Sequence, residues 1–378
     1  MSKKLTALAL VLVLLAGCAA PQQAARPSEH DWCGLSYQDE LPLDYADQFA
    51  ITHYQDGYAR VQIADGGCYL VVPPDGAVPD GLAPEVTVLQ QPLDRIYLVA
   101  TSAMDLFRAL DGLDSIRLSG TKAEGWYIDE ARQAMEAGDI LYAGKYSAPD
   151  HERIYTEGCD LAIESTMIYH APAVKEQLER MGVPVLVERS SYESSPLGRM
   201  EWIKLYGLLL DKEDEAQAVY AQALEGLEGV LDQPSTGKSV AFFSITSNGA
   251  ANVRRASDYV AKMIEMAGGR YVFDDLGGEN ALSTVNLQME AFYEGAKDAD
   301  CLIYNSAIDG GVRTLDELLQ KSPLLAHCKA VQTGDVWCTA QNLFQSAMGL
   351  GDLIRDMHTV LTEDDPDPAA LTYLYRLT

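Results

Sequence analysis

Polar and aromatic side chains that could hold a ligand follow the expected strands, where each strand gives way to a loop. Ligands of open α/β sheets bind outside the carboxyl ends of the strands, so residues at these positions are candidates for a binding site. In the first half of the chain the candidates are Ser102, Trp126, Tyr127, Lys145, Tyr146, Tyr169, His170, Arg189 and Tyr192. In the second half they are Asn248, Arg254, Arg255, Asn305 and Gln341. Such a set of aromatic rings and polar donors suits a large planar or chelated ligand.

Two kinds of side chain in this set have specific chemistry. The guanidinium groups of Arg189, Arg254 and Arg255 could clamp an anionic group bidentately, although each could equally pair with one of the many surface acids. Tyr169 and His170 are residue types that can ligate haem iron, and they can also be ordinary polar residues of a loop. Both interpretations stay open at the level of sequence.

The sequence offers no catalytic constellation, so we predict no catalytic residue and no metal site. Gly237-Lys238-Ser239 ends like a phosphate-binding loop, but Asp232 stands where that loop needs a glycine, and the segment precedes a strand. The chain has no HExxH, GxGxxG or GxSxG pattern. The enzymatic alternative is a metal chelatase, which would use His170 with Glu164 or Glu193.

The elements that must position these residues alternate between strand and helix in two blocks, residues 93–196 and 233–378. This alternation predicts parallel sheets with helices on both faces. Between the blocks, residues 197–232 carry apolar side chains at helical spacing and no proline, which predicts a long connecting helix with a break near Asp211. In the second block, Ala330-Val331 and Val336-Trp337 are expected to form closing strands.

Residues 46–92 precede the first block and have a different pattern. Their β-rich runs surround Asp56-Gly57 and Asp65-Gly66-Gly67, which are typical turn sequences. We therefore expect a small antiparallel β meander packed on the first block.

The N-terminus has the order of a secretory signal: Lys3 and Lys4, an apolar run, and then Leu15-Ala16-Gly17-Cys18. The cysteine makes it resemble a bacterial lipoprotein signal, which implies removal of residues 1–17 and a diacylglyceryl thioether on Cys18. The apolar run is shorter than the roughly 20 residues that span a bilayer. We expect an extracytoplasmic protein held by lipid on the outer face of the plasma membrane, the periplasmic side if there are two membranes. The alternative is an uncleaved anchor.

Residues 18–45 follow the expected cleavage point. They are rich in Ala, Gln, Pro and acidic residues without an apolar period, which predicts a flexible tether. Removal of residues 1–17 leaves 26 basic against 56 acidic residues. This negative charge repels phosphate backbones, so we expect no nucleic-acid partner.

Six cysteines besides Cys18 could be oxidised in an exported chain. Fifteen pairings are possible, and Cys33 with Cys68 and Cys328 with Cys338 are only the local candidates. Cys159 and Cys301 each begin an apolar strand-like run, so they are expected to be buried thiols.

Two segments of the blocks echo each other. Glu152-Arg-Ile154 begins a helix that leads to Asp160-Leu-Ala-Ile163, and Glu290-Ala-Phe292 begins a helix that leads to Asp300-Cys-Leu-Ile303. With the lipoprotein signal and the connecting helix, this order resembles the substrate-binding proteins of ABC importers. The resemblance covers roughly Leu93 to Leu361 and is nearest to the class for ferric siderophores, haem and cobalamin.

The resemblance implies an α/β fold of two Rossmann-like lobes joined by one rigid helix, with the ligand in the cleft between them. It implies that Glu152 and Glu290 dock on arginines of an ABC permease dimer that works with an ATPase. Both glutamates could instead simply cap their helices. The implied ligand is a ferric siderophore, haem or cobalamin, with no intrinsic cofactor and no catalysis, and we expect a monomer. Besides the chelatase, the alternative is an extracellular sensor of a ligand.

Overall fold

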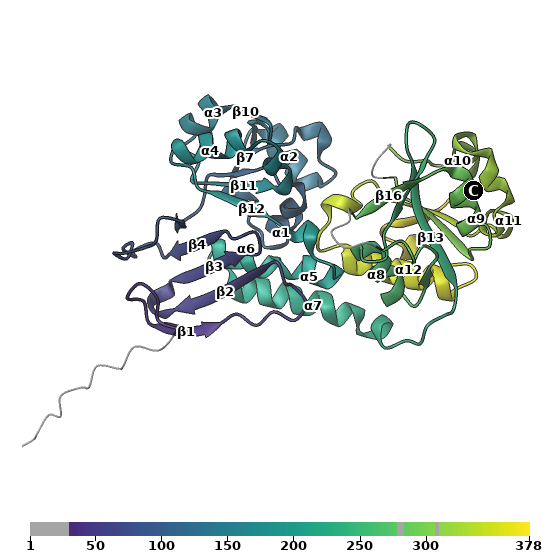
Figure 1. Cartoon of the computed structure of the whole chain (residues 1–378), viewed down its shortest axis with the longest axis horizontal. Coiled ribbons are helices and arrows are strands. Elements are labelled where there is room, and N and C mark those ends of the chain that lie inside the picture. The colour runs from purple at the N-terminus through teal and green to yellow at the C-terminus, as the bar shows by residue number, and fades with distance from the viewer. Residues whose placement is uncertain (1–29, 278–282, 307–309) are drawn as a thin grey trace, which may run out of the picture.

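The computed structural model describes residues 30–277, 283–306 and 310–378. These residues form an N-terminal sheet, a first lobe and a second lobe, and the long helix α7 (Glu213–Leu231) runs from the first lobe toward the second (Figure 1). The predicted α/β class, with two lobes, a long joining helix and an N-terminal meander, is confirmed. Cys18 lies outside the described residues.

The N-terminal sheet has the spatial order β1-β2-β3-β4-β5. Its strands are β1 (Tyr37–Glu40), β2 (Phe49–Tyr54), β3 (Ala59–Ile63), β4 (Cys68–Val72) and β5 (Val86–Gln90). Strands β1 to β4 pair antiparallel, as the meander requires, whereas β5 runs parallel to β4. The sheet begins earlier than predicted, because β1 lies within residues 18–45, which we assigned to the tether. In the turn after β2, Asp56 and Gly57 have φ of 63° and 81°, a region that glycine adopts without strain.

This sheet packs against the connecting helices and the edge of the first lobe. The ring centroids of Phe49 and Trp202 are 5.0 Å apart, and the Tyr69 hydroxyl donates to the Val185 carbonyl at 3.0 Å. The inner face of the sheet therefore shares one hydrophobic core with the lobe.

The first lobe contains a fully parallel sheet in the order β12-β11-β6-β7-β8. The strands are β6 (Ile96–Leu98), β7 (Ile116–Ser119), β8 (Leu141–Tyr142), β11 (Leu161–Ser165) and β12 (Val185–Glu188). Side chains alternate between its faces. One face packs on α1 (Met104–Ala109) and α2 (Asp129–Ala137), and the other on α3 (His151–Thr156) and α4 (Pro172–Arg180).

The connecting segment is not one continuous helix. It consists of α5 (Pro196–Glu201), α6 (Ile203–Leu209) and α7. The predicted break near Asp211 is confirmed, because that residue has φ of 57°, which ends the helical path. Helix α7 alone, with 19 residues, is about 28 Å long at 1.5 Å per residue.

The second lobe contains a mixed sheet in the order β16-β14-β13-β17-β18-β19, with β15 also paired to β13. Its strands are β13 (Ser239–Ile245), β14 (Ala251–Arg254), β15 (Arg270–Tyr271), β16 (Thr284–Leu287), β17 (Cys301–Tyr304), β18 (Val336–Thr339) and β19 (Leu374–Arg376). Only β15, β13, β17 and β18 are parallel. The outer strands β14, β16 and β19 are antiparallel to their neighbours.

The second-lobe helices are α8 (Tyr259–Met266), α9 (Met289–Ala296), α10 (Leu315–Lys321), α11 (Lys329–Thr333) and α12 (Leu350–Thr362). The prediction of a strand at Ala330-Val331 is wrong, because these residues lie in α11. That helix is closed by Gly334 in the left-handed region.

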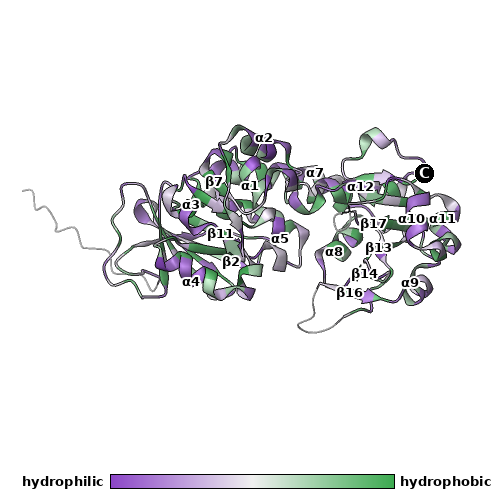
Figure 2. Cartoon of the chain, turned by 90° about the horizontal axis from the view of Figure 1, so that it is seen from above, coloured by the Kyte–Doolittle hydropathy of each residue, from purple (hydrophilic) through white to green (hydrophobic). Residues whose placement is uncertain are grey.

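Seen from above, the two lobes are separate bodies along the long axis, and α7 and α12 lie near their junction (Figure 2). Among the described residues, no helix is both long and apolar enough to cross a bilayer. None of the six cysteines within the described ranges forms a disulfide, and Cys301, Cys328 and Cys338 are buried.

Candidate ligand site and docking residues

The carboxyl ends of strands from both lobes come together around the 3-10 helix η8 (Leu343–Gln345), which follows β18. Gln345 accepts a hydrogen bond from the Tyr127 amide and donates one to the Gly125 carbonyl, both at 2.8 Å. The rings of Tyr127 and Phe344 meet edge to face with centroids 6.3 Å apart, and each side chain stays 41% exposed. At this place a predicted site residue of the first lobe, Tyr127, touches the second lobe.

Two further predicted residues lie beside this junction. Ser102 belongs to the 3-10 helix η2 (Thr101–Ala103), which packs against η8, and its hydroxyl donates to buried Glu188 at 2.9 Å. Gln341 precedes η8 and donates to the Gly310 carbonyl. Sequence reasoning missed Phe344 and Gln345, although both follow β18 closely enough for the strand-end rule to include them.

A cluster of arginines and tyrosine lies where α5 meets α8. The guanidinium of Arg199 stacks 3.9 Å from the centre of the Tyr259 ring, and that of Arg254 lies 6.0 Å from the same ring. Arg254 also pairs with Asp258 at 3.6 Å. Burial raises the pKa of Asp258, and the positive charges of Arg254 and Arg199 oppose this rise. Arg199 was missed because it lies inside the segment predicted as the connecting helix.

Arg189 and Tyr169 bond to residues of the N-terminal sheet and its adjoining segments, and Tyr192 contacts Arg189. The Arg189 guanidinium stacks 4.2 Å from the centre of the Tyr192 ring and donates to the Gln48 amide oxygen at 3.2–3.3 Å. The Tyr169 hydroxyl donates to Asp65. Burial and this hydrogen bond raise the pKa of Tyr169 to about 12, so the phenolate that would ligate ferric haem is disfavoured.

The remaining candidates do not converge. Trp126 is 2% exposed and donates to the Ser119 hydroxyl at 3.2 Å, so its ring belongs to the core of the lobe and does not face a ligand here. Asn305 is also buried. Arg255 donates to the Gly277 carbonyl at 3.2 Å. The others are partly or fully exposed, on the β9–β10 hairpin (Gly144–Lys145 and Ala148–Pro149), after β11 or in the turn after β13: Lys145, Tyr146, His170 and Asn248.

The two docking candidates have matching environments. Glu152 is exposed in the first turn of α3, and Glu290 is exposed in the first turn of α9. Neither carboxylate has a hydrogen bond or ion pair with any described residue. Neither caps its helix, because Asp150 accepts the capping hydrogen bond of α3 and the cap of α9 has no side-chain hydrogen bond. The structure thus removes the capping explanation for both residues.

The residues that a chelatase would need do not gather. Glu193 is committed to the backbone amides of Asp47 and Gln48 and to the Trp202 indole. Both oxygens of Glu164 are buried without a partner, and burial raises the pKa of this carboxyl to about 8. Among the described residues, no three His, Cys, Asp or Glu side chains lie together as a metal site would require.

Residues 99–343 match a family model described as periplasmic binding protein. A curated relative, an uncharacterised lipoprotein of Methanocaldococcus jannaschii, is 25% identical over 349 residues, which are 86% of this chain and 81% of the relative. A second uncharacterised lipoprotein of that organism is 23% identical over 97% of this chain and 96% of its own length.

Solved structures with the same fold include three binding proteins. A periplasmic haem-binding protein of Pseudomonas aeruginosa has a TM-score of 0.59 at 17% identity, over 75% of this chain and 98% of that one. A structure from an ABC-type Fe3+-hydroxamate transport system of Saccharomonospora viridis has a TM-score of 0.54 at 20% identity. The match covers 72% of this chain and 94% of that one. A periplasmic vitamin B12 binding protein of Vibrio cholerae has a TM-score of 0.51 at 16% identity. The match covers 71% of this chain and 97% of that one.

Proposed function

The chain belongs to the periplasmic binding protein family, and from this premise we propose that it captures a metal-chelate ligand between its lobes and delivers it to an ABC permease with its ATPase. It acts as a monomer outside the cytoplasmic membrane and is anchored by a lipid on Cys18. The relatives named as lipoproteins support the anchor. It performs no catalysis, since the matching family consists of solute-binding proteins.

The observation that carries this proposal is the junction of Tyr127, Phe344 and Gln345. A buried glutamine fixes the two strand-end loops to each other, and two half-exposed aromatic rings stand beside it. Aromatic faces and edges are suited to a flat or chelated ligand because they offer large contact area with little loss of side-chain entropy.

We infer that the ligand is an iron complex, either haem or a ferric siderophore, in preference to cobalamin. The Arg199–Tyr259–Arg254 cluster concentrates positive charge in a chain of net charge −28, and among the described residues Asp258 is the one carboxylate paired within it. Haem carries carboxylates and many ferric chelates are anionic, so a cationic cluster distinguishes them from a neutral corrinoid.

The test begins with the absorption spectrum of the protein purified from its host, because haem, ferric chelates and corrinoids absorb in different visible bands. The stripped protein is then titrated with haemin, ferrichrome and cyanocobalamin, with tryptophan fluorescence as the signal. We expect one iron complex to bind and Phe344→Ala to weaken it about tenfold, since an aromatic contact contributes about 1.4 kcal/mol. Tyr45→Ala, which removes an exposed tyrosine of the segment before β2, is the matched control. Unchanged affinity of Phe344→Ala, or binding of cyanocobalamin alone, would contradict the assignment.

A further inference from the structure

The segments around Glu152 and Glu290 share more than the glutamate. Glu152-Arg-Ile154-Tyr155 aligns with Glu290-Ala-Phe292-Tyr293 without a gap. In each helix the glutamate is the second residue, since α3 begins at His151 and α9 at Met289. Ile154 and Phe292 are both fully buried, so both helices present the same face to their own lobe.

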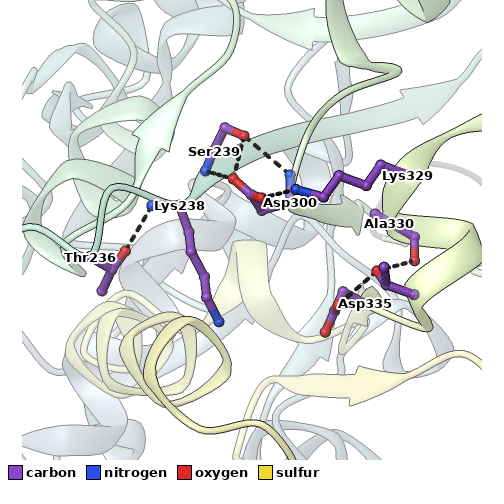
Figure 3. A network of polar contacts seen from close by, with 8 residues as sticks. Thr236, Lys238, Ser239, Asp300, Lys329, Ala330 and Asp335 are labelled. Carbon is purple, nitrogen blue, oxygen red and sulfur yellow. Dashed lines mark hydrogen bonds and ion pairs between the residues drawn. The ribbon is translucent and has the colours of Figure 1, made fainter.

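The aspartates after the two helices show that these segments occupy the same place in each lobe. The Asp160 carboxylate accepts hydrogen bonds from the Asp94 and Arg95 amides at 2.9 Å, just before β6. The Asp300 carboxylate accepts from the Ser239 amide and hydroxyl at 2.7 Å, at the start of β13 (Figure 3). Each aspartate therefore ties its own strand to the parallel neighbour, β11 to β6 and β17 to β13.

The difference in spacing between glutamate and aspartate now has a structural cause. Helix α3 has 6 residues and α9 has 8, and this difference accounts for the two additional residues before Asp300. The glutamate and the tyrosine keep their relative position, because the longer helix adds its residues after Tyr293. Glu290 is thus the structural counterpart of Glu152.

The tyrosine at the third position after each glutamate lies on the same helix face as that glutamate. Tyr155 is 70% exposed, the highest value among the exposed large hydrophobic residues of the described chain. Tyr293 is partly exposed and packs on its lobe. Some other helical acids are paired with lysine or arginine, as in Asp129–Arg132 and Lys262–Glu265, whereas Glu152 and Glu290 have no such pair with a described residue. Each lobe therefore displays an unpaired carboxylate next to an aromatic ring.

A carboxylate beside a tyrosine ring suits an arginine, which can donate to the first and stack on the second. The chain itself uses arginine–tyrosine stacking at Arg199–Tyr259 and Arg189–Tyr192. Two equivalent pairs, one on each lobe, fit a partner that repeats one cationic site by two-fold symmetry.

We propose that Tyr155 and Tyr293 form, with Glu152 and Glu290, a duplicated Glu-x-x-Tyr docking surface for arginines in the two equivalent subunits of the permease. This inference rests on the proposed function. It adds two residues and a stacking contact to the docking of the glutamates.

The experiment places the photo-cross-linker p-benzoylphenylalanine in place of Tyr155, of Tyr293 or of Tyr45 in the full-length chain in its host membrane. We expect the first two positions to cross-link to one polytopic ABC permease and the Tyr45 position to give no such product. That permease complex, purified in detergent, is then titrated with the wild-type chain and with its variants. Tyr155→Ala/Tyr293→Ala should bind at least tenfold more weakly, Glu152→Ala/Glu290→Ala should not bind, and Tyr45→Ala should bind as the wild type.

The outcomes distinguish the docking role of the two tyrosines from the proposed function as the partner of an ABC permease. If the tyrosine double variant binds the permease as the wild type does, the docking role of the tyrosines is overturned while the proposed function stands. If neither position cross-links to a permease, both the inference and the permease partner are overturned. Retained haemin, ferrichrome or cyanocobalamin binding and unchanged circular dichroism in each variant confirm that the lobes are still folded.

Discussion

At the scale of single residues, Glu164 is a buried carboxyl group whose ionisation should destabilise the fold. It lies in β11, is 0% exposed, and neither carboxylate oxygen has a partner among the described residues. Burial without a compensating charge disfavours the ionised form and raises its pKa to about 8. A group whose pKa is higher in the folded state binds more protons there. Its contribution to stability is therefore present at low pH and is lost as the pH rises from about 4.5 toward 8.

We therefore predict that Glu164→Gln stabilises the protein at pH 8, by about 1–3 kcal/mol, because it removes the need to bury or protonate a carboxylate. This increase in the free energy of unfolding should shrink to near zero at pH 5, where the carboxyl group of the folded wild type is already neutral. Urea denaturation at both pH values measures the difference, and Glu179→Gln on the exposed face of α4 serves as control. An equal gain at pH 5 and pH 8 would show that ionisation is not the cause.

Single side chains also show why only part of the candidate site could be predicted from the sequence. Position after a strand selected Tyr127 and Ser102, which lie at or beside the junction with η8, because the ends of parallel strands gather at one edge of a sheet. It could not tell which way a side chain turns. Trp126 enters the core to donate to Ser119, and its neighbour Tyr127 points to the junction. Nor could the sequence reveal that Arg189 would donate a hydrogen bond to Gln48, and Tyr169 one to Asp65.

At the scale of elements, the N-terminal sheet is fastened by two buried carboxylates. Glu193 accepts from the amides of Asp47 and Gln48 and from the Trp202 indole at 2.8–3.1 Å. Glu201 accepts from the amides of residues 44–46 and from Lys204. Burial would raise the pKa of Glu201, but these donors hold it below its usual range. The segment before β2 is thus wrapped around the side chains of Glu193 and Glu201.

Glu193→Ala should therefore loosen this sheet specifically. The substitution leaves two backbone amides and the Trp202 indole without their acceptor. We therefore expect the free energy of unfolding to fall by about 3 kcal/mol or more. Hydrogen exchange should accelerate first in β2 and β3 and less in the second-lobe strands β13 and β17. Glu85→Ala, an exposed acid near the same sheet, provides the comparison. Uniform acceleration across both lobes would mean that the sheet is not a separately anchored unit.

Elements were predicted best where one periodicity is uninterrupted. The first lobe follows the alternation of strand and helix closely, because each strand is a short apolar run between turns. The second lobe was harder to predict, because β14, β16 and β19 are antiparallel additions to the parallel set. Ala330-Val331 is too short an apolar pair to distinguish a strand from the single helical turn that Gly334 closes.

At the scale of the whole molecule, the lobes are joined by more than the connecting helices. Gln345 binds the Gly125–Tyr127 loop, and the Met348 amide donates to buried Asp105 at 2.9 Å. On the other side, Arg355 of α12 donates to the Gly226 carbonyl of α7 at 3.2 Å. A hinge that opened the lobes widely would have to break these contacts as well as bend α7.

We therefore predict that ligand binding rotates the lobes by only a few degrees. Small-angle scattering should give radii of gyration for the stripped and saturated protein that agree within about 1 Å, a shear-like shift instead of hinge closure. Saturation uses whichever of haemin, ferrichrome and cyanocobalamin binds in the titration. Gln345→Ala combined with Asp105→Ala removes the three hydrogen bonds from Gln345 and Asp105 across the lobes while leaving α7 intact, and this variant should show a larger ligand-dependent change than Tyr45→Ala. A large contraction of the wild type on binding would contradict the prediction. So would a double variant as rigid as the wild type, since it would show that the hydrogen bonds of Gln345 and Asp105 do not limit the motion of the lobes.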